Sequence, residues 1–133
     1  MKSQTIVVIV LLLIVFLVGF MPQYIKVKRL ESDLSVAKQE NALARLRDLA
    51  GLAFVQTSQK NYGLAAGTSQ QFFSRTREVA NGAADLNARK ALENLLASQD
   101  KITAELAKGD SEALSDLQVL FEKTRQASAF IDR

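Results

Sequence analysis

The 133-residue chain has its apolar residues in two different stretches, with Val and Ile crowding the first 20 positions and Leu and Ala dominating after residue 25. Its 17 basic and 14 acidic residues leave a net charge of +3, and both signs are mixed along the second stretch, which is typical of a solvated helix surface and not of a nucleic-acid site. His and Cys are absent, which excludes disulfides and thiolate metal sites, so we expect a membrane segment followed by one modest domain.

The first predicted element is a transmembrane helix. No Asp, Glu, Lys or Arg occurs from Ser3 to Ile25. At ~1.5 Å per residue this segment spans roughly 34 Å as a helix, more than a hydrocarbon core of about 30 Å. A cleavable secretory signal is the alternative, but the apolar run is long for one and offers no small-x-small cleavage site. We therefore predict an uncleaved, single-pass signal anchor over residues 1–25.

The charges that flank this segment predict its orientation. Lys26, Lys28 and Arg29 follow it, so the positive-inside rule places the C-terminal domain in the cytoplasm. A short tail that begins Met-Lys is also the usual start of an anchor that exports the domain behind it, so an extracytoplasmic domain is the alternative. The same three cations are candidates to contact membrane lipid head groups.

Residues 26–45 predict a juxtamembrane helix with a short coiled-coil seam. Six residues fit heptad positions a and d: Val27, Leu30, Leu34, Ala37, Asn41 and Ala44. Three g-to-e pairs join opposite charges: Lys26 with Glu31, Asp33 with Lys38, and Glu40 with Arg45. Such pairs meet across a parallel two-stranded coil, and Asn at an a position fixes its register.

Fewer than three heptads are marginal alone, but anchoring both chains in one membrane raises their effective concentration and aligns them in parallel. We therefore predict a parallel homodimer. The alternative is that Leu30 and Leu34 cover other helices of the same chain.

Four helices are expected after Pro22, which can begin a helix or kink a continuing one. They cover residues 23–60, 62–80, 83–107 and 111–131. Gly82 and Gly109 mark stops because Gly can adopt the left-handed conformation that closes a helix, and Asp110 is placed to cap the last helix. Each helix carries an apolar face with spacings of three and four: Leu43, Leu46, Ala50, Ala53 and Phe54; Ala65, Phe72, Phe73, Thr76 and Val79; Leu92, Leu95, Leu96, Ile102 and Leu106; Leu114, Leu117, Leu120, Phe121 and Phe130.

An internal repeat supports a paired arrangement of these helices. Residues 60–77 align with residues 108–125 without gaps, and five residues recur at an offset of 48: Lys60, Ala65, Phe73, Thr76 and Arg77 as Lys108, Ala113, Phe121, Thr124 and Arg125. The predicted fold class is therefore all-α, with an N-terminal transmembrane helix followed by a four-helix bundle of two related helical hairpins. The bundle domain covers residues 46–133.

Two local patterns have competing explanations. Gly63-x-x-x-Gly67 would let another helix approach closely, but we expect packing within the chain or a frayed helix start. Phe72 and Phe73 would form a ligand-facing pair, but adjacent residues of an amphipathic helix more often place one ring in the core and one at its rim.

The sequence does not assemble the groups that enzymes use. General acid-base catalysis, covalent catalysis and metal hydrolysis need His, an activated nucleophile or clustered ligands, and no pair of acidic residues is expected to face the core, where burial would raise its pKa. We expect no enzyme, cofactor, metal or nucleic acid. Two functions remain: a membrane-anchored scaffold or adaptor that docks a protein partner, and a stand-alone extracytoplasmic sensor that binds a small ligand between helices.

Overall fold

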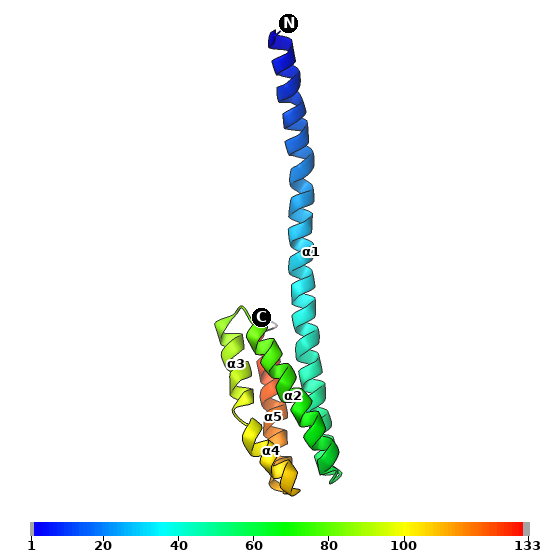
Figure 1. Ribbon diagram of the computed structural model, residues 1–133, viewed down its shortest axis with the longest axis vertical. Helices are drawn as coiled ribbons and strands as arrows, with labels where there is room; N and C mark the ends of the chain where they lie inside the picture. Colours follow the sequence, from blue (N-terminus) through cyan, green and yellow to red (C-terminus); the bar gives the residue numbers. More distant parts are fainter. Residues whose placement is uncertain (1, 132–133) are drawn as a thin grey trace. The chain divides into compact units, whose positions relative to one another are not determined.

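The computed structural model describes residues 2–131, without the side chains of residues 2, 20, 21, 130 and 131, so the predicted core position Phe130 lies outside the described side chains. The described residues form five α-helices and no strand (Figure 1), which confirms the all-α class. The helices are α1 (Lys2–Ser58), α2 (Tyr62–Gly82), α3 (Leu86–Leu96), α4 (Gln99–Lys108) and α5 (Glu112–Ile131). The chain divides into two compact units, Met1–Lys38 and Gln39–Arg133.

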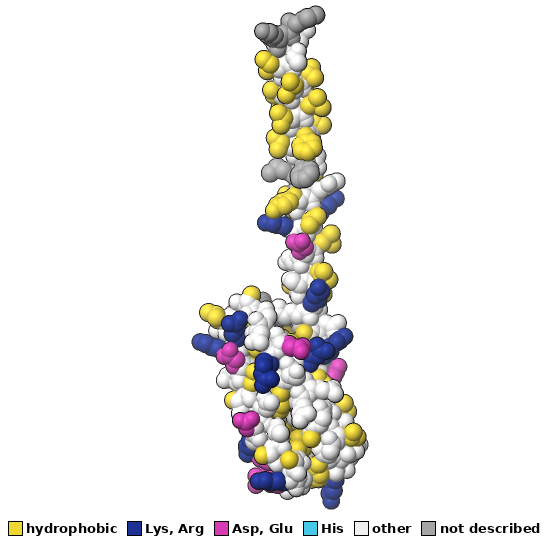
Figure 2. Space-filling model, viewed as in Figure 1, with side chains coloured by type: hydrophobic (Ala, Val, Ile, Leu, Met, Phe, Trp, Pro, Cys, Tyr) yellow, Lys and Arg dark blue, Asp and Glu magenta, His cyan; other side chains and the backbone are white. Residues whose placement is uncertain are grey.

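The first unit consists of the N-terminal part of α1, which is long and apolar enough to cross a membrane by length and composition. Its apolar side chains from Ile6 to Val18 are 49–70% exposed, and Figure 2 shows them covering the helix on all visible sides before the first blue side chains appear. α1 continues through Pro22, so no helix begins there. Pro22 has no N–H, and the helix therefore lacks one backbone hydrogen bond at this point.

The second unit has one hydrophobic core to which all five helices contribute. α2 packs against α3 and α4, and α5 packs against the same two helices. The core residues follow the predicted spacings and are, helix by helix, Leu43, Leu46, Ala50 and Ala53; Ala65, Phe72, Phe73 and Ala80; Leu92 and Leu95; Ile102 and Leu106; Ala113, Leu117 and Leu120. Burying each large aliphatic side chain stabilises the fold by about 1.5–3 kcal/mol, so this core is what holds the second unit together.

Two helix ends close with the same left-handed turn. Lys60 (φ 59°) follows α1 and Gly109 (φ 64°) follows α4. In each turn the next residue's N–H reaches back five residues, from Asn61 to Gln56 O at 2.8 Å and from Asp110 to Glu105 O at 2.9 Å. This is the Schellman arrangement, which satisfies the last carbonyls of a helix. The prediction that Gly109 closes a helix is confirmed. In the first turn a lysine, Lys60, takes the left-handed conformation instead of a glycine. The repeat aligns Lys60 with Lys108, so the left-handed residue of the second turn lies one position later than the alignment would place it.

Gly82 does not close α2 as expected. It remains in the helix, and the chain leaves through Ala83 in an extended conformation (φ −72°, ψ 122°). The Arg89 side chain donates to Ala80 O and to Ala83 O, both at 3.3 Å, and so takes over the role of a left-handed cap. The next helix begins at Leu86 because Asp85 accepts hydrogen bonds from the N–H groups of its first turn.

The helix predicted over 83–107 is in fact two helices. α3 ends at Leu96 and α4 begins at Gln99. The Ser98 hydroxyl donates to Leu95 O at 2.8 Å, and the Ser98 N–H points to the same carbonyl at 3.4 Å. A serine hydroxyl that donates to a nearby backbone carbonyl competes with the regular hydrogen bonds of the helix. The helix is interrupted at Ala97 and Ser98, where this hydrogen bond forms. Asp110 accepts from the Glu112 N–H at 3.0 Å, as its predicted capping role requires.

Candidate functional site

The residues of the predicted dimer seam are exposed along α1. Val27 is 53% exposed, Leu30 68% and Leu34 56%. Ala37 and Asn41 are also exposed, and Ala44 is half-buried. Within the first unit, Leu30 and Leu34 thus present apolar side chains on the surface of α1. The first four seam residues belong to the first unit and the last two to the second.

The six charged residues assigned to the seam are exposed side chains of α1. They are Lys26, Glu31, Asp33, Lys38, Glu40 and Arg45. Within residues 2–131 the ion pairs involve other residues, so these six charges remain available to a second chain. Residues five apart on one helix do not face each other, which is why the predicted pairs have no counterpart in a single chain.

The three cations that follow the apolar run are exposed as well. They are Lys26, Lys28 and Arg29. The Lys28 ammonium lies 5.3 Å from the centroid of the Tyr24 ring, within the range of a cation–π contact. A tyrosine at the end of an apolar segment suits the interface between hydrocarbon and head groups, and Lys28 places a positive charge at the same level.

A charged cluster joins α4 to α5 in the second unit. Lys101 Nζ lies 2.6 Å from Asp116 Oδ2 and 3.5 Å from Glu105 Oε1. Glu105 is 8% exposed, and its Oε2 is buried without a hydrogen-bond donor among the described residues. One acidic residue therefore faces the core, because Glu105 lies three residues after Ile102 and on the same buried face, whereas the Asp116 side chain is 26% exposed.

The cluster shifts the pKa values of its members. Burial raises the pKa of Glu105 above 4.5, and the neighbouring Asp116 carboxyl adds to the effect. The hydrogen bond from Lys101 holds the pKa of Asp116 below 3.8. The cluster joins one buried carboxyl, one partly exposed carboxyl and one exposed cation, and among the described residues no group of three or more acidic, His or Cys side chains could hold a metal ion.

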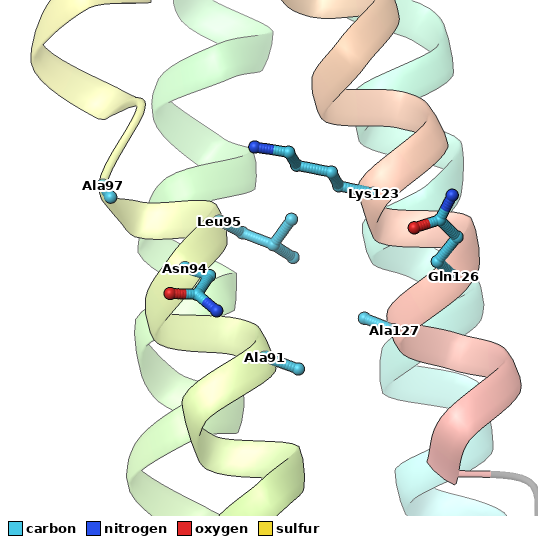
Figure 3. A pocket seen from close by; sticks show the side chains of 7 residues that line it. All are labelled: Ala91, Asn94, Leu95, Ala97, Lys123, Gln126 and Ala127. Carbon is cyan, nitrogen blue, oxygen red and sulfur yellow. The ribbon is translucent and has the colours of Figure 1, made fainter.

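A groove of about 420 Å³ opens between α3 and α5. Its lining comes from both helices: Ala91, Asn94, Leu95, Ala97, Lys123, Gln126 and Ala127. Figure 3 shows Lys123 extending from α5 across the groove toward α3, while Leu95 points from α3 toward α5. Ala91 and Ala127 face each other below them. The groove thus combines an apolar floor with one cation and two amides, and sequence reasoning did not identify it.

The structure contradicts close packing at the glycine pattern and the expected placement of the two phenylalanine rings, while Gly63 does lie in the first turn of α2. Gly63 and Gly67 are exposed, and a Cβ added to either would meet nothing within 4 Å, so close packing within the chain does not explain them. Phe72 and Phe73 are both buried, with ring centroids 5.1 Å apart at 80°. Neither ring lies at the rim, and both are core residues in edge-to-face contact.

Three exposed arginines of the second unit are engaged with neighbouring side chains. Arg75 pairs with Glu78 at 2.9 Å, and Arg125 pairs with Glu122 at 3.3 Å. Arg77 donates to the Gln99 side chain at 2.9 Å. Each arginine is exposed, so these contacts are those of a solvated helix surface.

Comparisons with protein-family models, with curated proteins and with solved structures gave no match to this chain.

Proposed function

We propose that the protein is a non-enzymatic, single-pass membrane-anchored adaptor that forms a parallel homodimer and docks a protein partner. The observation that carries this proposal is the exposed stripe of Val27, Leu30 and Leu34, which begins directly after the uncharged apolar run. Exposed leucines that recur at heptad spacing need a second helix to remove them from water.

The charge pattern supports a parallel arrangement. In a parallel two-stranded coil each g residue meets the e residue of the following heptad on the other chain, and all three such pairs here are opposite in sign, beginning with Lys26 and Glu31. Asn41 occupies an a position, where a polar side chain fixes register and dimeric state. Two chains that cross one membrane in the same direction can pair only in parallel.

Lys26, Lys28 and Arg29 anchor the chain at the cytoplasmic surface in this proposal, with the domain in the cytoplasm. Fusing the C-terminus to a reporter that fluoresces only in the cytoplasm, and separately to an enzyme active only outside it, tests the orientation. Fluorescence agrees with a cytoplasmic adaptor, whereas export activity would contradict it and favour the extracytoplasmic sensor.

The second unit is proposed to be a bundle of two related hairpins, one formed by α1 and α2 and one by α4 and α5. Ala65 and Ala113 occupy equivalent buried positions, both fully inaccessible. Thr76 donates to Phe72 O at 2.8 Å, and its counterpart Thr124 donates to the equivalent carbonyl of α5 at 2.7 Å. Matching burial and matching hydrogen bonds support a common design.

The sensor remains the competing function, and the form of the groove argues against it. A small-molecule site usually buries most of its ligand. The groove between Leu95 and Ala127 is open along the surface of the second unit, which suits a protein segment better than a free small ligand.

Single-cysteine crosslinking tests the dimer directly, since the natural chain contains no Cys. Leu34→Cys places a thiol in the proposed seam, and Val36→Cys places one on another side of the same helix as the matched control. In native membranes we expect a disulfide-linked dimer from Leu34→Cys and little from Val36→Cys. Equal crosslinking of the two variants would contradict the seam.

A further inference from the structure

The groove between α3 and α5 exists because its walls are built from alanines. Ala91 and Ala97 line it from the α3 side, and Ala127 lines it from α5. The methyl side chains of these alanines are too small to fill the space between the two helices. Leu95 is the one bulky apolar side chain among the lining residues. The volume of about 420 Å³ falls in the range of known binding pockets.

The rim of the groove carries an unmatched positive charge. Lys123 makes no ion pair with a described residue, since the nearby Glu122 pairs with Arg125 at 3.3 Å. Asn94 and Gln126 are exposed, and their amides make no hydrogen bond to the described part of the chain. The lining thus offers donors to an anion and includes no carboxylate that would repel one.

The neighbouring turns extend the same chemistry along both helices. Lys90 is exposed and lies four residues before Asn94 on α3, and residues four apart are neighbours on one helix face. Val119 is 49% exposed and lies four residues before Lys123 on α5. One turn from the lining a ligand would therefore find Lys90 and Val119. By the same spacing it would also find two carboxylates, Glu93 before Ala97 and Glu122 before Gln126, of which Glu122 is paired with Arg125.

We infer that this groove docks an acidic, amphipathic segment of the adaptor's protein partner. An apolar side chain of the segment lies on the floor formed by Ala91, Leu95 and Ala127, and a neighbouring carboxylate accepts hydrogen bonds from Lys123. The inference rests on the proposed adaptor function and names the chemistry of its partner. A polymer suits the open groove because contacts on either side add to what the groove buries.

Fluorescence anisotropy with full-length protein in neutral nanodiscs tests the inference. The probe is a short labelled peptide that alternates Leu with Asp, and its control has Asn in place of each Asp. We expect saturable binding of the Asp peptide and a loss of about tenfold or more for the Asn peptide, the size of one charge-assisted hydrogen bond.

Variants of the protein separate the groove from general electrostatics. Lys123→Glu should weaken Asp-peptide binding by about tenfold or more. Lys123→Gln removes the same charge without reversing it and should also weaken binding, so it serves as the test if Lys123→Glu does not fold. The matched control Lys108→Glu changes an exposed lysine outside the lining and should leave affinity unchanged. Ala91→Leu, which fills the groove without altering charge, should also weaken binding.

Three results would overturn the inference. The first is that the Asn peptide binds as tightly as the Asp peptide, and the second is that Lys108→Glu weakens binding as much as Lys123→Glu. The third is that N-acetyl-leucine displaces the peptide completely with the peptide's own affinity, which would assign the groove to a small carboxylate. Crosslinking through Leu34→Cys is measured on matched samples. If peptide binding fails while crosslinking persists, the groove assignment is wrong and the dimeric adaptor still stands. If crosslinking fails while peptide binding persists, the dimer is wrong and the groove stands.

Discussion

Replacing Leu30 by Ala should weaken the dimer while leaving the fold of the single chain intact. Leu30 is 68% exposed in one chain, and burying a whole leucine is worth about 1.5–3 kcal/mol. Covering the exposed fraction would therefore contribute about 1–2 kcal/mol per chain, or about 2–4 kcal/mol per dimer. At about 1.4 kcal/mol per tenfold change, the dissociation constant should rise roughly 30-fold to 700-fold in Leu30→Ala.

Energy transfer between donor-labelled and acceptor-labelled chains, measured over a lipid dilution series, gives this constant in a bilayer. Val36→Ala is the matched control, because Val36 is also exposed, at 52%, but lies outside the seam. It should leave the constant within about threefold of the natural chain. If the two substitutions change it equally, or if neither does, the stripe is not the dimer interface. Urea unfolding of the second unit should be the same in both variants, since neither side chain is buried.

Three further predictions concern the stability of the second unit, measured by urea unfolding. Leu46 is fully buried, so Leu46→Ala should cost about 2–5 kcal/mol; a cost below about 1 kcal/mol would mean that the core does not include α1. Lys60→Gly should stabilise and Gly109→Ala destabilise, each by about 1 kcal/mol, because both positions have positive φ; effects of the same sign would contradict the two left-handed turns. The raised pKa of Glu105 means that its contribution to stability is full below pH 4.5 and is lost as pH rises through the raised value. Glu105→Gln should remove that loss. If the free energy of unfolding changes with pH above 4.5 in the same way in Glu105→Gln as in the natural chain, the raised pKa of Glu105 is wrong.

The core could be predicted from the sequence because burial follows helix periodicity. Leu43, Leu46, Ala50 and Ala53 have spacings of three and four and are all buried. Periodicity carries this information because side chains at those spacings share one face, whatever that face packs against. The turn at Gly109 was predictable for a local reason as well, since glycine tolerates positive φ without a Cβ penalty.

The break between α3 and α4 could not be predicted in this way. Ala97 is a good helix former, and a single serine does not end most helices. The Ser98 hydroxyl captures the Leu95 carbonyl here, and the outcome of that competition depends on how the two segments pack against α2 and α5. Packing decides between two local options of similar energy, so the sequence of the segment is not sufficient.

Glu105 shows a different limit of sequence reasoning. Its spacing from Ile102 placed it on the buried face, but acidic residues are rarely buried without a partner. The partners are Lys101 on the same helix and Asp116 on α5. The second of these is visible only when α4 and α5 are brought together. The groove was missed for a related reason, since its alanines and Lys123 come from helices that are far apart in the sequence.

The stripe on α1 and the groove between α3 and α5 share neither a residue nor a helix. Substitutions at independent sites without common partners usually add within about 0.3–0.5 kcal/mol. The effects of Leu30→Ala on dimerisation and of Lys123→Glu on peptide binding should therefore combine without interaction in the double variant. If peptide binding weakens when the stripe is broken, one chain does not bind the peptide on its own, and the docking surface must be completed by the second chain of the dimer.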